Sequence, residues 1–188
     1  MSIIHDRLKF AGIETIEGAV RKIAPIASAL PGTSEASATI PPAETAPIYK
    51  DPVLVAITQI GEKEVAGSTD NPAIMQYAKD CGMGYDHDEI SWCSLFINWV
   101  MLMCGLTRSR TLAARDWLKI GIKITDPKMG DVVIFWRNSP SSWMGHVAIF
   151  LRIENGVVYC IGGNQSDSVS VTTMPLNQVL GYRRMEKI

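Results

Sequence analysis

Cys93 stands at the start of a continuous apolar segment, residues 92–101, with the sequence WCSLFINWVM. Such a segment predicts a buried helix, and a cysteine at its start lies at the positive end of the helix dipole. That position favours the thiolate, which is the nucleophilic form of cysteine. Cys93 is therefore a candidate nucleophile for acyl transfer, provided that a base and an orienting group can reach it.

His146 and the neighbouring amides Asn164 and Gln165 can supply these two functions. The chain has three histidines, and His146 is the one on an expected core strand. An imidazole can take the thiol proton, and an amide oxygen can hold the imidazole in the required tautomer. The order of a cysteine, a strand histidine and a later amide predicts a thiol hydrolase site.

The register of one expected hairpin decides between the two amides. If Asn155 and Gly156 form a two-residue turn, counting back along the strands places His146 opposite Gln165. If the turn has three residues, His146 lies opposite Asn164. A shift by one residue exchanges the candidates because directly opposed residues share a face. We predict Asn164, whose shorter side chain is the stiffer orienter, and retain Gln165 as the alternative third member.

The elements that must position these residues follow from hydrophobic periodicity and from turn residues. Helices are expected at 52–62, 70–80, 92–104 and around 112–119, and strands at 131–136, 145–153, 157–161, 168–171 and 180–183. Ser91 is expected to cap the helix that carries Cys93. Because helices precede strands, the fold class is α+β, with N-terminal helices packed on an antiparallel sheet.

The first 48 residues differ in composition from the remainder. Residues 1–30 predict an accessory amphipathic helix, because apolar residues recur at three- and four-residue steps. Residues 31–48 are rich in Pro, Ser, Thr and Ala and predict a linker. The cysteine hydrolase domain is therefore expected to span 49–188.

Composition excludes several function classes. The net charge of −1 provides no electrostatic footprint for nucleic acid. No apolar stretch reaches the roughly 18 residues of a membrane span, so stable membrane insertion is not expected. The four cysteines fit no zinc pattern, and we expect no cofactor. Residues 21–30 resemble a signal peptide only weakly, so synthesis in the cytoplasm without a convincing signal peptide is expected.

Two further features bear on substrate and metal binding. Trp92, Trp136 and Trp143 are assigned to a substrate groove, with loop anchoring as the alternative for the latter two. The acidic loop 86–89 could ligate a metal or simply be solvated, and we expect a solvated loop and no metal site.

Several ordered motifs resemble the NlpC/P60 and CHAP superfamily of papain-like cysteine peptidases and amidases. The motifs are Ser91–Trp99, Gly130–Val133, Gly145–Ala148, Gly162–Asp167 and Leu180–Arg183. The resemblance covers roughly residues 52–184. It implies a papain-like NlpC/P60-type domain with Cys93 as nucleophile, His146 as base and Asn164 as orienter. Trp92 stands where many NlpC/P60 members have Asp, and glycines stand where many CHAP members have Glu.

The resemblance also implies a substrate, which is peptidoglycan. We expect an amidase or endopeptidase that cleaves a stem-peptide amide bond in the periplasm or on the cell wall. A phage endolysin with a holin partner would fit, as would an exported antibacterial effector with a secretion partner and an immunity protein. The alternatives are a catalytically idle binding module of a phage or secretion particle and an acyltransferase of the same superfamily.

Overall fold

The computed structural model describes residues 51–67 and 69–188, all within one compact unit, Tyr49–Ile188. The helix expected at 1–30 and the linker expected at 31–48 lie outside the described residues. Within those described, no helix has the length and apolarity needed to cross a bilayer.

Two helices precede the helix that carries Cys93. Helix α3, Pro52–Thr58, begins at Asp51, whose Oδ1 accepts a hydrogen bond from the Val53 N–H at 2.8 Å. It ends earlier than predicted. Beyond its end, the Gly61 N–H donates a backbone hydrogen bond to the Val169 carbonyl. Helix α4, Pro72–Cys81, follows the prediction closely because each signal is local: Asn71 caps its start and the left-handed Gly82 ends it.

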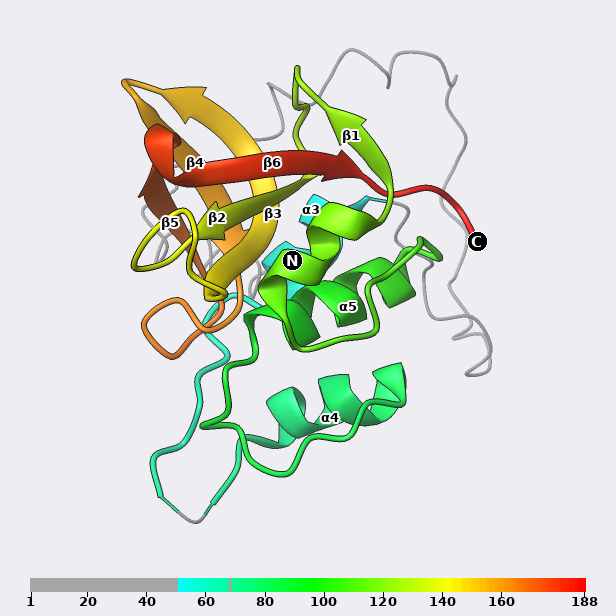
Figure 1. Cartoon of the computed structure of the whole chain (residues 1–188). Coiled ribbons are helices and arrows are strands. Elements are labelled where there is room, and N and C mark those ends of the chain that lie inside the picture. Colours follow the sequence, from blue (N-terminus) through cyan, green and yellow to red (C-terminus); the bar gives the residue numbers. More distant parts are fainter. Residues whose placement is uncertain (1–50, 68) are drawn as a thin grey trace, which may run out of the picture. The chain divides into compact units, whose positions relative to one another are not determined.

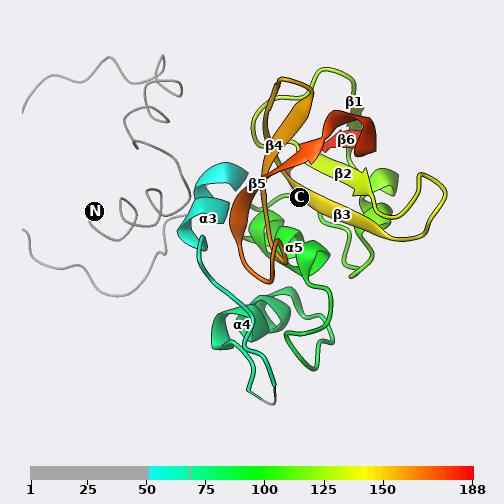
Figure 2. The same cartoon turned by 90° about the vertical axis from the view of Figure 1, so that its left-hand side faces the viewer.

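Helix α5, Cys93–Met103, is buried and packs against α4 and strand β3 (Figures 1 and 2). The predicted cap at Ser91 is wrong. Trp92 occupies the N-cap position and its side chain makes no capping hydrogen bond. The first N–H groups of a helix have no intrahelical partner. Cys93 is therefore the first residue of α5, at a helix end that no side chain caps.

The segment after α5 was expected to form an α-helix around 112–119. It is instead a 3-10 helix, η1, which spans Ala114–Lys119. The side chain of Trp117 in η1 is buried, and its indole Nε1 donates a hydrogen bond to Ser94 Oγ at 2.8 Å. This contact ties η1 to the first turn of α5.

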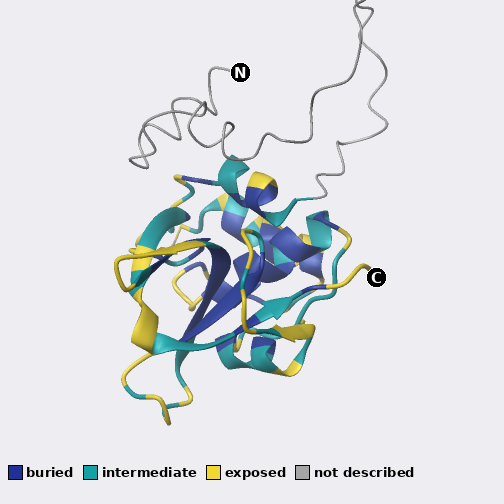
Figure 3. Cartoon of the chain, turned by 90° about the horizontal axis from the view of Figure 1, so that it is seen from above, coloured by how far each residue is buried: buried dark blue, intermediate teal, exposed yellow. Residues whose placement is uncertain are grey.

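Six antiparallel strands form a single sheet, which confirms the predicted α+β class. The strand order is β1-β6-β2-β3-β4-β5. The bounds are β1 Ile122–Ile124, β2 Val132–Trp136, β3 Gly145–Glu154, β4 Val157–Gly162, β5 Ser170–Pro175 and β6 Val179–Arg184. A short 3-10 helix, η2 (Leu176–Gln178), precedes β6. Strand β2, residues 146–150 of β3 and most of helix α5 are buried and form the centre of the domain (Figure 3).

The hairpin of β3 and β4 has the two-residue turn. Glu154 pairs with Val157, and both turn residues, Asn155 and Gly156, have positive φ. The three-residue alternative is therefore wrong. A bulge at Leu151 then shifts the register by one residue before the strands reach the site. This irregularity has no counterpart in the alternating sequence pattern.

Candidate active site

Cys93 begins α5 with its side chain almost wholly enclosed, at 3 % exposure. Burial alone would raise the pKa of the thiol. The hydrogen bond and charge of His146, the Val147 N–H and the charge of Arg137 outweigh burial and lower the pKa to about 7. A substantial fraction of Cys93 is therefore thiolate near neutral pH, whereas an ordinary cysteine is mostly thiol.

His146 lies near the start of β3, opposite Phe135 of β2, with the ring centroids 6.3 Å apart. Its two ring nitrogens meet different groups. Nε2 lies 3.0 Å from Gln165 Oε1, and Nδ1 lies 3.5 Å from an Arg137 guanidinium nitrogen. The ring is buried at 1 % exposure, so packing and hydrogen bonds fix its orientation.

Gln165 fixes the tautomer of His146. Its Nε2 donates to the Ser170 carbonyl at 2.5 Å, and a carbonyl only accepts, so this end of the amide must be the nitrogen. The other end is therefore the oxygen and accepts the Nε2–H of His146. With its proton on Nε2, neutral His146 keeps the Nδ1 lone pair free to act as a base.

The structure thus places Gln165 on His146, where Asn164 was predicted. The ladder between β3 and β4 ends before it reaches either amide. Asn164 then adopts a left-handed backbone with φ 55°, which turns the chain and brings the next side chain under the imidazole. Among the described residues, no hydrogen bond joins Asn164 to His146. Continued strand pairing was the wrong assumption.

Two glycines before this turn make room for the site. A Cβ on Gly163 would lie 2.5 Å from the Trp92 ring, and one on Gly162 would lie 3.0 Å from Gln165 Oε1. Gly163 therefore lets the chain pass over the buried indole. Gly162 leaves the space that the Gln165 amide occupies. Both glycines of the Gly-Gly-Asn-Gln motif are therefore explained by steric exclusion, because a side chain at either position would meet a residue of the site.

Arg137 is a site residue that the sequence pattern did not single out. It follows Phe135 by two residues, so it shares the sheet face of Phe135 and His146. Its guanidinium lowers the pKa of Cys93 and lies beside Nδ1 of His146. The strand period could have identified it, since Arg137 continues the inward face of β2 by one step.

Arg115 holds the loop between β2 and β3. Its guanidinium donates to the carbonyls of Met144 and Pro140, each at 3.1 Å. This clamp fixes the chain immediately before His146. The loop is therefore tied to η1, and through η1 to the first turn of α5.

The predicted tryptophan groove is not formed as proposed. Trp92 is completely buried and its Nε1 donates to Glu64 Oε2 at 3.0 Å, so it cannot line a groove. Trp136 alternates with Phe135 and lies on the sheet face opposite His146, with its Nε1 donating to the Asn177 carbonyl. Trp143 is 84 % exposed in the loop before β3. Of the three, Trp143 is exposed, Trp136 is half-buried and Trp92 is buried.

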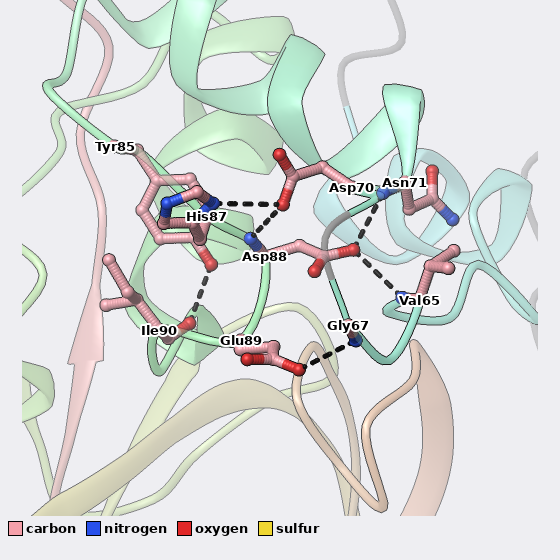
Figure 4. Close-up of polar contacts among 9 residues, drawn as sticks. All are labelled: Val65, Gly67, Asp70, Asn71, Tyr85, His87, Asp88, Glu89 and Ile90. Atoms are coloured by element: carbon pink, nitrogen blue, oxygen red, sulfur yellow. Dashed lines mark hydrogen bonds and ion pairs between the residues drawn. The ribbon is translucent and has the colours of Figure 1, made fainter.

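The acidic loop before α5 contains a buried structural carboxylate (Figure 4). Asp88 is fully buried, and its Oδ2 accepts the N–H groups of Val65 and Asn71 at 3.0 and 2.7 Å. Asp70 in turn accepts the Asp88 N–H at 3.0 Å. The expectation of a solvated loop is therefore wrong for Asp88, although Asp86, His87 and Glu89 are exposed. In the part of the chain that the structure describes, no group of three His, Cys, Asp or Glu residues could hold a metal ion.

Comparison with known protein families matches residues 82–164 to the CHAP domain. This range begins at the C-terminal end of α4 and includes Cys93, His146 and Asn164, while Gln165 is the next residue. A comparison with curated proteins finds no relative of this chain. CHAP domains are typically cysteine hydrolases or amidases that cleave peptidoglycan. Residues 82–164 therefore match the CHAP domain, and the α+β fold that surrounds them, with helices packed on a six-stranded antiparallel sheet, is consistent with a papain-like CHAP domain.

Proposed function

We propose that this protein hydrolyses an amide bond of the peptidoglycan stem peptide by Cys-His-Gln thiol catalysis. One observation carries the proposal: His146 lowers the pKa of Cys93 to about 7 while its Nε2 is held by Gln165. A structural cysteine has no need of this arrangement. Burial raises the pKa of Cys104 to about 11 and of Cys160 to about 12, as expected for inert core thiols.

The first half of the reaction acylates the enzyme. The Cys93 thiol proton moves to Nδ1 of His146, and the sulfur attacks the amide carbonyl carbon. The carbonyl π electrons move to oxygen, and the oxyanion can accept a hydrogen bond from the Cys93 N–H at the start of α5. Collapse of this intermediate breaks the C–N bond, and His146 gives its proton to the leaving amine. The product of this half is a thioester on Cys93 and a free amine.

The second half removes the acyl group. Nδ1 of His146 takes a proton from water, and the hydroxyl oxygen attacks the thioester carbonyl. Breakage of the C–S bond releases a carboxylic acid and regenerates Cys93. Gln165 acts in both halves through one contact, because it accepts the Nε2–H of neutral His146 and of the imidazolium alike.

The proposal also includes the biological setting in which the enzyme acts. The hydrolase acts on the cell wall either as a phage endolysin delivered through a holin or as an exported antibacterial effector. An effector would require an immunity protein in the producing cell. The wall itself is the substrate in both settings.

Digestion of purified peptidoglycan by the full chain tests the proposed function. Mass spectrometry of the soluble products should show fragments that differ from intact muropeptides by cleavage at an amide. A new lactyl carboxylate identifies an amidase, and a new amino-acid carboxylate identifies an endopeptidase. Peptidoglycan whose amide bonds remain intact after prolonged incubation would rule out hydrolysis. Acyl transfer instead would yield a new amide and no carboxylate.

A further inference from the structure

A cavity of about 350 Å³ lies between the end of α4 and the segment after α5. Its walls are residues 81–84 on one side and Arg108 with residues 110–112 on the other. Cys93, His146 and Gln165 do not line it. Its volume is within the range of small-ligand sites, which begins at about 300 Å³.

Two arginines bring positive charge to this cavity. Arg108 and Arg110 both line it, and within the described residues neither forms an ion pair. Arg108 donates from one guanidinium nitrogen to the Cys81 carbonyl at 3.0 Å, but its Nε is buried and has no hydrogen-bond partner in the described structure. Because Nε is enclosed by the protein, the terminal guanidinium nitrogens of Arg108 and Arg110 are the donors available to a ligand in the cavity.

The nearby acidic and thiol groups in the described part of the chain do not form an ion pair with Arg108. Asp80 precedes Cys81, but its carboxylate accepts hydrogen bonds from Trp99 Nε1 at 2.9 Å and Gln76 Nε2 at 2.7 Å. Burial raises the pKa of the Cys81 thiol, and the charge and the hydrogen bond of Arg108 only partly offset this effect. Cys81 therefore stays neutral near pH 7 and leaves the charge of Arg108 uncompensated.

The segment that carries Arg110 is held in place by α5. Arg110 has a left-handed backbone with φ 58°, an uncommon conformation for a side chain of this size. The buried Asn98 holds it there, because its Oδ1 accepts the Arg110 N–H at 2.8 Å. The next carbonyl, that of Thr111, accepts the hydroxyl of Ser94, the residue after Cys93. The wall of the cavity is thus bonded directly to the first turn of the nucleophile helix.

We propose that this cavity binds a carboxylate group through Arg108 and Arg110. The planar guanidinium group matches the two oxygens of a carboxylate, and each hydrogen bond that it donates to the anion is charge-assisted. The carboxylate can come from the stem peptide, in which case the inference rests on the proposed hydrolase function. It can also come from a small free dicarboxylate. Both sources share the chemistry that the two arginines recognise.

Isothermal titration calorimetry of the full-length Cys93→Ala protein tests the proposal without requiring turnover. The probes are a free-acid stem tetrapeptide, the same peptide with its carboxylates amidated, and succinate. Arg108→Gln and Arg110→Gln should each weaken binding of a carboxylate probe by about tenfold or more, the effect of one charge-assisted hydrogen bond. Arg152→Gln is the matched control, since Arg152 is a solvent-facing arginine over Tyr159.

The three probes distinguish a carboxylate of the stem peptide from that of a free dicarboxylate. If free-acid peptide binding depends on the arginines and the amidated peptide binds weakly, the carboxylate belongs to the substrate. If succinate alone shows this dependence, the ligand is a free small carboxylate. Arg108→Lys, which keeps the charge, controls for folding and should retain part of the affinity. Equal affinity of every probe for all variants would overturn the proposal. If the wild-type protein binds succinate through the arginines but does not hydrolyse peptidoglycan, the proposed hydrolase function is wrong and the carboxylate site stands.

Discussion

The side-chain oxygen of Gln165 lies 3.0 Å from Nε2 of His146, and its nitrogen is bound by the carbonyl of Ser170. These two contacts leave one orientation for the amide and one tautomer for the neutral imidazole. The orienting function is therefore a property of Gln165 and its backbone anchor together. Asn164 contributes the left-handed turn that delivers Gln165 to this position.

Gln165→Ala should reduce the rate of peptidoglycan hydrolysis by roughly 10- to 100-fold, a part of the ~10²–10⁴-fold that a positioned base contributes. The loss should appear in kcat rather than KM, because the amide orients the base and does not touch the substrate. Steady-state kinetics on soluble muropeptides measure this split. Asn164→Gly is the matched control and should stay close to wild type, because glycine readily adopts the left-handed backbone. A larger loss in Asn164→Gly would reverse the assignment.

Alkylation of Cys93 by iodoacetamide should increase with pH around an inflection near pH 7, because its pKa is lowered to about 7. The sign follows from thiolate reactivity: above the inflection the nucleophilic form predominates. Cys104 and Cys160, whose pKa values are raised by burial, should react far more slowly at neutral pH. Peptide mapping after brief labelling identifies the modified thiol. A Cys93 profile with its inflection near pH 9 would contradict the pairing with His146.

Gly163→Ala should destabilise the domain by about 1–3 kcal/mol, the usual cost of overpacking a core. The added methyl would lie 2.5 Å from the Trp92 ring and 2.7 Å from Phe96, both of which are buried. Urea unfolding followed by tryptophan fluorescence measures the change. Gly84→Ala is the control, because its added methyl would have no atom within 4 Å and its φ is not left-handed. Equal stability of the two variants would refute the steric explanation of the motif.

Asp88→Ala should lower the free energy of unfolding by about 1–3 kcal/mol for each backbone donor that it leaves buried and unpaired. The two donors are the N–H groups of Val65 and Asn71. Asp86→Ala removes an exposed carboxylate two residues away and should have almost no effect. Thermal unfolding of both proteins is the measurement. If Asp86→Ala is the more damaging, the loop owes its stability to surface charge.

Sequence alone predicted the elements whose signals are local and missed the features that depend on tertiary contacts. Helix α4 could be placed because Asn71, Pro72 and Gly82 mark its ends in the sequence. Cys93 and His146 could be selected because helix and strand patterns surround them. After the bulge at Leu151, continued pairing would have set Asn164 opposite His146; Gln165 reaches His146 because the ladder ends and Asn164 is left-handed, and neither feature alters the hydrophobic pattern.

The burial of Trp92 had no sequence signal either. An indole beside a nucleophile suits a groove wall or a core equally well, and the decision comes from Gly163 and Glu64, which are distant in sequence and adjacent in space. The burial of the polar residue Asp88 likewise had no sequence signal. Its carboxylate is buried because two backbone N–H groups from the preceding loop converge on it.

Replacement of the nucleophile, Cys93→Ala, tests whether Cys93 carries out amide hydrolysis. Wild type, Cys93→Ala and Cys104→Ala are incubated with the same purified peptidoglycan, and new amino groups are quantified over time. We expect release by wild type and Cys104→Ala at similar rates and at least about a 10³-fold slower release by Cys93→Ala, because the nucleophile has been removed. Undiminished release of amino groups by Cys93→Ala would show that Cys93 is not the nucleophile.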